Sequence, residues 1–113
     1  MRGLALIVAV CGIAACANES EQPVITEAKR LIAANCASCH EVPGVGGANG
    51  RVGPSLARIA HQQIIAGHFA NTPDALALWI AHPQRLLPGD AMPEMGLTDE
   101  QARSIATYLY TLE

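Results

Sequence analysis

The most informative stretch of this sequence is Cys36-Ala37-Ser38-Cys39-His40. Two cysteines three positions apart lie on the same side of one helical turn, and the histidine follows the second cysteine directly. This order of residues is the attachment sequence for haem c. Each sulfur can form a thioether with one vinyl group of the haem, and the imidazole can reach the iron through Nε2 while its Nδ1–H donates to a backbone carbonyl. The stretch predicts one covalent haem c, held by Cys36 and Cys39, with His40 as an axial iron ligand.

Other interpretations of the cysteine pair explain less of the sequence. A thioredoxin-like redox pair would need a surrounding βαβ pattern, which is absent. A zinc site would need two more ligands at matching spacing, and no second cysteine pair follows. A structural disulfide is compatible with an oxidising compartment but leaves His40 unexplained.

The N-terminal stretch is typical of an export signal. Residues 3–15 form an almost unbroken apolar run behind Met1-Arg2, too short to span a bilayer. The run ends in Ile13-Ala14-Ala15-Cys16, which is typical of a lipoprotein signal cleaved before Cys16, the residue that would carry the lipid. Ala15-Cys16-Ala17 also fits ordinary signal peptidase, which would give a soluble periplasmic protein. Both routes export the chain, and the first anchors it on the periplasmic side of a bacterial membrane.

Composition limits the partners and the size of the core. The chain has 113 residues, with seven basic and ten acidic side chains. Without Arg2 the net charge is near −4 and Lys29 is the only lysine, so there is no basic patch for a nucleic acid. A domain this small has little core of its own, and a covalent haem would supply both apolar mass and a crosslink.

The rest of the chain predicts helices separated by long loops. Caps and helical spacing predict helices at 26–35, with Thr26 as the N-cap, from Thr72-Pro73 to Pro83, and from Thr98 to the C-terminus, plus a short helix within 56–65. Proline and glycine predict loops at 41–55 and 86–96, and no strand pattern is present. We therefore expect a signal peptide at 1–15, a flexible tether at 16–25 and an all-α domain at 26–113, with three to four helices and long loops around the haem.

With the attachment motif near its start, the domain resembles class I cytochrome c. Gly53-Pro54-Ser55-Leu56 is similar to the family's Gly-Pro-x-Leu, which implies that the Pro54 carbonyl accepts the hydrogen bond from His40. Leu56 of the same motif is expected to pack on the haem. Trp79 is interpreted as a core residue that packs on the haem, with a role as a redox relay as the alternative. Ala91-Met92-Pro93, after the Pro88-Gly89 turn, resembles the ligand loop and implies Met92 as the second axial ligand. Several segments look closest to bacterial cytochrome c domains associated with haem–copper oxidases.

Chemistry also favours a methionine as the sixth iron ligand. A thioether is a soft, neutral donor that prefers Fe(II) and raises the reduction potential. Met95 is the other candidate sulfur, with an alternative role in packing on the haem edge. The remaining histidines, His61, His68 and His82, are interpreted as surface residues and not as iron ligands. The arginines Arg51, Arg58 and Arg85 are also interpreted as surface residues, with pairing to the haem propionates as their alternative role.

These observations predict a one-electron carrier and not an enzyme, since two filled axial positions leave no open iron site for a substrate. The expected role is transfer to or from a membrane respiratory complex such as a terminal oxidase. Docking is expected to be weak and to use an apolar patch around the haem edge, built from the loops that hold Val42, Val45, Ala91 and Met95. The alternatives are a haem c subunit of a periplasmic dehydrogenase, with the same motifs, or a gas-binding or peroxidatic haem protein with an open distal site.

Overall fold

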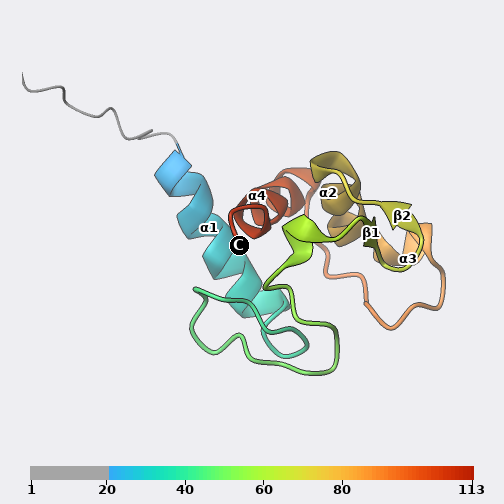
Figure 1. The fold of residues 1–113 in the computed structure, drawn as a ribbon, viewed down its shortest axis with the longest axis horizontal. Helices are drawn as coiled ribbons and strands as arrows, with labels where there is room; N and C mark the ends of the chain where they lie inside the picture. The colour runs from blue at the N-terminus through green and yellow to red at the C-terminus, as the bar shows by residue number, and fades with distance from the viewer. Residues whose placement is uncertain (1–20) are drawn as a thin grey trace, which may run out of the picture.

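The computed structural model describes residues 21–113 (Figure 1). The predicted signal peptide, Cys16 and the first part of the tether lie outside the described residues. The described elements are, in chain order, α1 (Glu21–Asn35), the 3-10 helix η1 (Ile59–His61), β1 (Ile64–Ile65), β2 (Phe69–Ala70), α2 (Pro73–Ala81), α3 (Pro83–Leu86) and α4 (Asp99–Leu109). The predicted all-α class is confirmed, because four helices account for most of the regular structure.

α1 begins earlier than the sequence predicts. Residues 21–25, which we assigned to a flexible tether, are helical, and the predicted cap at Thr26 is wrong. The Thr26 hydroxyl donates to the carbonyl of Gln22 at 2.9 Å, so this residue lies within the helix. Pro23 is tolerated because it lies in the first turn, where helix N–H groups have no acceptor within the helix.

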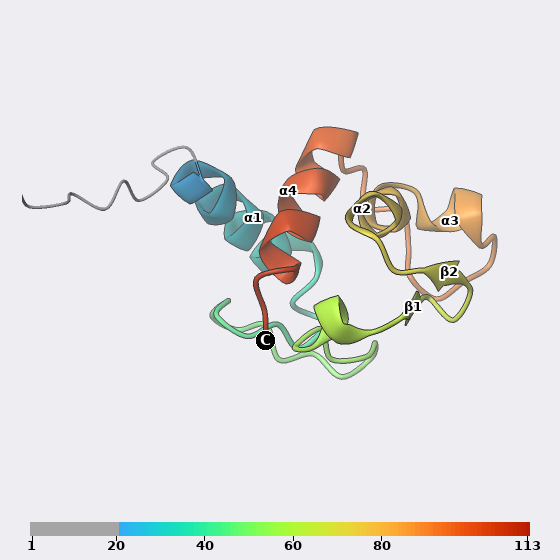
Figure 2. The same ribbon diagram turned by 45° about the horizontal axis from the view of Figure 1, so that its top comes forward.

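The core forms where α4 packs between α1 and α2 (Figure 1 and Figure 2). Ala28 and Ile32 of α1 and Ile105 and Tyr108 of α4 are all buried. The buried residues of α4 recur at helical spacing on one face. The crossing of the first and last helices therefore closes the domain.

Local signals fix both ends of α2 and the start of α4. The Thr72 side chain accepts from the N–H of Ala75, and Thr98 forms a complete capping box with Gln101. Pro83 ends α2 as predicted, but it also occupies the first turn of α3, where its missing N–H costs nothing. The helix α3 was not predicted.

A short hairpin replaces part of the predicted helix at 56–65. Only Ile59–His61 forms a 3-10 turn, and β1 then pairs with β2 in antiparallel register. Ala66 and Gly67 both adopt positive φ, and His68 N–H donates to the Ile65 carbonyl at 3.1 Å, which closes the turn. The expectation of no β-structure is therefore wrong for this segment.

The loop at 41–55 folds back on itself and packs on the core. Val42 N–H donates to the Ala48 carbonyl at 2.9 Å, and the Tyr108 hydroxyl of α4 donates to the Pro43 carbonyl at 2.6 Å. Val42 and Val45 are buried, at 1% and 9% exposure, so they cannot form the predicted docking patch. No helix in the described part of the chain has the length and apolar character needed to cross a bilayer.

Candidate cofactor cavity

The cysteine pair lies in a tight turn that continues α1. Cys36 N–H donates to the Ile32 carbonyl at 2.8 Å, and His40 N–H donates to the Cys36 carbonyl at 2.9 Å. Each bond joins residues four positions apart, as in an α-helix, so the two cysteine side chains and the imidazole project from the same turn. This is the local geometry that the spacing predicts.

Two residues of the following loop contact the imidazole ring of His40. Its Nδ1 lies 2.7 Å from the Pro54 carbonyl oxygen, the partner that the resemblance implies. Because a carbonyl can only accept, Nδ1 carries the proton and Nε2 keeps its lone pair for a metal. Gly53 packs against the imidazole so closely that a Cβ at this position would overlap with the ring. Pro54 and Gly53 therefore fix both the tautomer and the orientation of His40.

One cavity of about 330 Å³ joins these groups to distant parts of the chain. Its lining includes Cys36, Cys39 and His40 from the turn, Pro54 from the following loop and Trp79 from α2. Trp79 is 8% exposed, and its ring lies 6.0 Å from that of Phe69. The lining is mainly apolar, as a site for a large flat cofactor requires.

Both methionines of the loop before α4 line the same cavity. Met92 and Met95 are each half-buried, and Met92 also packs against the hydrophobic core. The structure therefore brings two thioether sulfurs to the cavity that contains the His40 ring. Cavity lining alone does not choose between them.

Other predicted residues lie elsewhere. Leu56 packs on the core but is not among the residues that line the cavity. The lining also omits the three remaining histidines and the three candidate arginines: His61, His68, His82, Arg51, Arg58 and Arg85.

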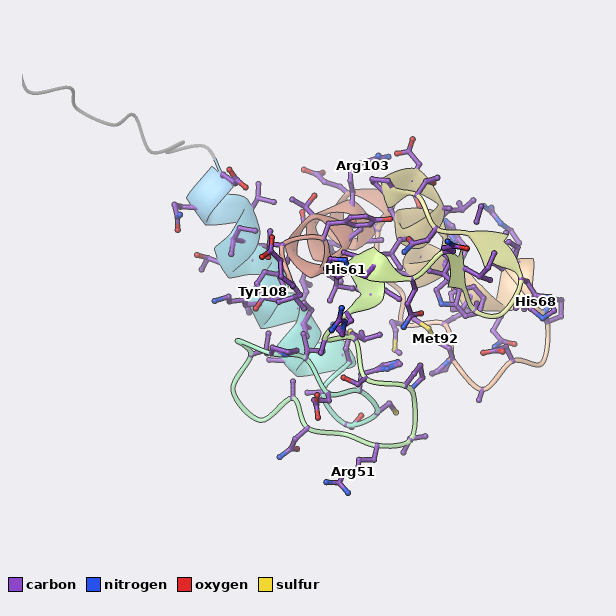
Figure 3. All side chains as sticks on the ribbon, viewed as in Figure 1. Arg51, His61, His68, Met92, Arg103 and Tyr108 are labelled. Atoms are coloured by element: carbon purple, nitrogen blue, oxygen red, sulfur yellow. The ribbon has the colours of Figure 1, made fainter. Side chains whose placement is uncertain are left out.

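The surroundings of these side chains agree with surface roles. The Nε2 atom of His82 lies 2.8 Å from Asp99 Oδ1, and His61 and His68 are exposed. Arg51 points away from the body of the protein (Figure 3), and Arg58 and Arg85 are exposed. None of these six residues contributes to the wall of the cavity.

The sequence reasoning missed part of the apolar wall. Ile59 and Ile65 are buried and line the cavity, together with the exposed Val52 and the turn residue Ala66. Ile59 and Ile65 were expected within one helix, and the hairpin places them in the wall instead. Gly67, which adopts a positive φ in the turn between the two strands, is a local feature of the sequence that is compatible with this arrangement.

The thiols are poorly suited to redox catalysis or to a zinc site. Burial, followed by the nearby Cys39, raises the pKa of the Cys36 thiol to about 11, whereas redox-active dithiols need a lowered pKa. Within residues 21–113, no three His, Cys, Asp or Glu side chains gather closely enough to hold a metal ion. Two thiols, a free imidazole nitrogen and a thioether in an apolar cavity instead fit a covalent haem.

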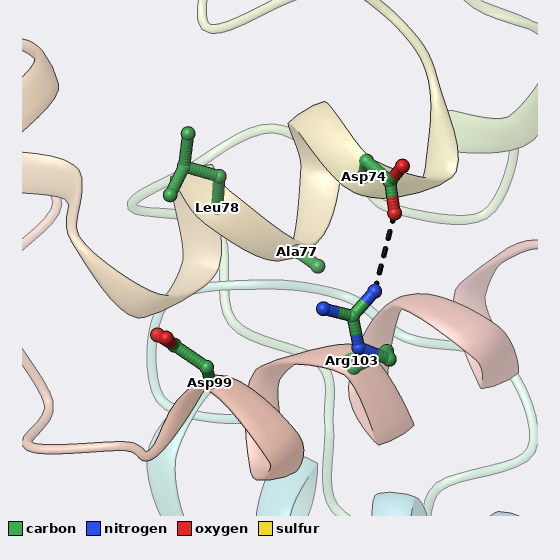
Figure 4. A pocket seen from close by; sticks show the side chains of 5 residues that line it. All are labelled: Asp74, Ala77, Leu78, Asp99 and Arg103. Carbon is green, nitrogen blue, oxygen red and sulfur yellow. Dashed lines mark hydrogen bonds and ion pairs between the residues drawn. The ribbon is translucent and has the colours of Figure 1, made fainter.

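A second hollow lies between α2 and α4 (Figure 4). Asp74, Ala77, Leu78, Asp99 and Arg103 line it, and Asp74 Oδ1 and Arg103 Nη1 form an ion pair at 3.1 Å. Its lining thus combines three charged side chains with two apolar ones.

Comparisons with known proteins agree with this arrangement. The chain is 38% identical over 100 residues to cytochrome c2 from Rhodopila globiformis, covering 77% of this chain and 92% of that protein. It is 29% identical over 104 residues to cytochrome c oxidase subunit 2 from Alkalihalophilus pseudofirmus, covering 90% of this chain but only 30% of that protein. The same named subunit from Bacillus sp. (strain PS3) is 30% identical over 95 residues, covering 80% of this chain and 27% of that protein.

A solved structure shares the fold. The c-type cytochrome SorU from Sinorhizobium meliloti superposes with a TM-score of 0.57 at 20% identity, covering 80% of this chain and 92% of that chain. The sequence model of the family described as Cytochrome c matches residues 25–113. The chain therefore belongs to the cytochrome c family, and it serves in electron transfer through covalently bound haem c.

Proposed function

We propose that this chain carries single electrons in a respiratory chain and that its redox partner is a membrane terminal oxidase. In this proposal Cys36 and Cys39 hold one haem c. His40 and Met92 are the two axial ligands of its iron. Bound haem c supplies an iron centre that gains and loses one electron, at a potential tuned by its ligands and surroundings. With two protein ligands in place, no iron position is left open for a substrate. The chain is then a carrier and not an enzyme.

The observation that carries this proposal is the meeting of all four groups in one apolar cavity. The Pro54 carbonyl keeps Nε2 of His40 available, and Gly53 leaves room for the ring. Ile59, Ile65 and Trp79 are buried side chains of the wall and exclude water from much of the site. Exclusion of water lets the ligands and nearby dipoles act strongly on the potential.

The backbone of Met92 favours this sulfur over that of Met95. Met92 N–H donates to Asp90 Oδ1 at 3.0 Å, and its carbonyl accepts from Gln84 Nε2 at 2.8 Å. Within residues 21–113, no hydrogen bond involves Met95. An axial ligand needs a fixed backbone, so we assign the sixth position to Met92.

The surface around the cavity supports apolar docking. The cavity rim, defined here as Val52, Pro54, Ala91, Pro93 and Met95, consists of apolar residues that line the cavity. Asp90 is the only acid in the lining, and no lysine or arginine contributes to it. Two relatives are named cytochrome c oxidase subunit 2, which supports an oxidase as the redox partner.

Oxidation by oxidase-containing membranes tests the partner. We expect the rate to change by less than about threefold between low ionic strength and ~0.3 M salt, because the rim has little charge to screen. Val52→Asp should slow the reaction about tenfold, because it places a charge on the apolar cavity rim. Val52 is 81% exposed, so the new carboxylate would lie on the docking surface. Val24→Asp is the matched control, since exposed Val24 lies on α1 and is not in the lining.

The outcomes separate the competing functions. A steep fall of the rate with added salt would refute apolar docking. No transfer at any salt concentration would favour the periplasmic dehydrogenase subunit. Carbon monoxide binding by the reduced wild-type protein would favour a gas-binding haem protein with an open distal site.

The cellular location is a separate proposal, because Cys16 lies outside the described residues. We infer from Ile13-Ala14-Ala15-Cys16 that a lipid on Cys16 anchors the chain on the periplasmic side of a membrane. Cys16→Ser should move the protein to the soluble fraction with its haem attached, because one lipid-bearing residue supplies the anchor. Cys11→Ser, within the apolar run, should leave the protein on the membrane. A wild-type protein that is already soluble, with its N-terminus at Asn18, would contradict the anchor.

A further inference from the structure

The side chain of Gln84 lies at the centre of the loop that carries Met92. Its Nε2 donates to the carbonyls of Asp90 at 2.7 Å and Met92 at 2.8 Å, and its Oε1 accepts from the N–H of Gly89 at 3.0 Å. One amide group thus satisfies three backbone groups within four residues of the loop. The acceptor and both donors of the amide are in use.

The backbone of Gln84 is fixed from the other side of Met92. Its N–H donates to Glu94 Oε1 at 2.9 Å, close to the start of α3, where helix N–H groups have no intrahelical partner. Residues 89–94 are therefore tied to Gln84 both before and after Met92. Asp90 adds a local bond by accepting from Met92 N–H at 3.0 Å.

The position of Gln84 is itself rigid. It follows Pro83, which is buried and lies in the first turn of α3, directly after α2. The Gln84 side chain therefore joins α3, which directly follows the helix that carries Trp79, to the methionine loop. The starts of α2 and α4 have capping hydrogen bonds of their own, in which Gln84 takes no part.

We propose that Gln84 is a positioning residue for Met92. Its amide holds the main chain of residues 89–92 in the closed arrangement, so that the Met92 thioether stays at the sixth position of the iron. The inference rests on the proposed function, in which Met92 is that ligand. Breaking the amide contacts should let the loop open and let an added ligand compete with Met92.

The test uses the complete haem-bearing protein and imidazole as the competing ligand. The affinity of the ferric protein for imidazole depends on the fraction of molecules in which the loop is open. In Gln84→Glu the side chain keeps its shape but loses both N–H donors of the amide. In Gln84→Leu the same donors are lost and no charge is added. Each variant should bind imidazole roughly tenfold more tightly, because two hydrogen bonds to carbonyl oxygens are lost. The far-red ferric absorption of methionine ligation should also weaken.

Gln101→Ala is the matched control. It removes the Gln101 side chain from the α4 capping box and should lower thermal stability, while imidazole affinity stays within about twofold of the wild type. Imidazole affinity unchanged in both Gln84 variants would overturn the proposal, as would an equal rise in Gln101→Ala. An effect of Gln84→Glu alone would also overturn it, because the added charge would then be responsible.

Met92→Ala separates failure of this inference from failure of the proposed function. If Met92→Ala keeps the methionine absorption, Met92 is not the ligand and both proposals fail. If Met92→Ala loses that absorption while the Gln84 variants behave as the wild type, only the positioning role of Gln84 fails.

Discussion

Replacing both Cys36 and Cys39 with alanine is expected to abolish covalent haem attachment, so that no haem stays with the denatured chain. The variant is also expected not to fold stably. Apolar side chains line most of the cavity of about 330 Å³, and without the haem they would lose their packing partner. A small domain has a total stability of only about 5–15 kcal/mol, which leaves little margin for such a loss. The loss of the cofactor should therefore unfold the protein.

Circular dichroism and haem staining of denatured samples would measure this effect. Ser38→Ala is the control, because Ser38 is exposed and lies in the same turn between the two cysteines. It should keep the haem and the wild-type helical content. Near-native helical content in the double cysteine variant, without haem, would show that the core is sufficient by itself.

Met92→Ala is expected to open the sixth iron position. The reduction potential should fall by on the order of 0.1–0.3 V, within the ~0.8 V range over which axial ligands act, because a donor that prefers Fe(II) is lost. Carbon monoxide should then bind the reduced protein. Spectroelectrochemistry and carbon monoxide titration would measure the two changes.

Met95→Ala is the natural control for this experiment, since Met95 also lines the cavity. It should leave the potential and the spectrum close to those of the wild type. The reverse behaviour of the two variants would mean that Met95 is the iron ligand.

The parts of the structure that the sequence predicted well depend on local chemistry. Thr72 and Thr98 cap helices through hydrogen bonds within three residues, so their signals are complete in the sequence. The turn at 36–40 is equally local. The α-helical class, both ends of α2 and the start of α4 could therefore be predicted from short stretches of sequence.

The parts that were missed depend on distant residues. Val42 and Val45 are buried partly because Tyr108, far along the chain, binds the Pro43 carbonyl. The hairpin contains two-residue strands and an alanine at positive φ, and neither gives a periodic pattern. The contacts of Gln84 join α3 to a loop whose shape is not encoded by any single turn motif.

The packing of α1 has a consequence for the order of events during biogenesis. Among the described elements, α4 is the helix with which α1 makes extensive contact, and α4 is the last of these elements in sequence order. The apolar side of α1 can be covered by α4 only after residues 99–109 have been synthesised. Contacts between segments this far apart in the sequence form slowly, because the intervening chain must first be closed into a loop. We expect the two thiols to remain accessible to the attachment machinery throughout this interval, so the cofactor joins an open chain that subsequently closes around it.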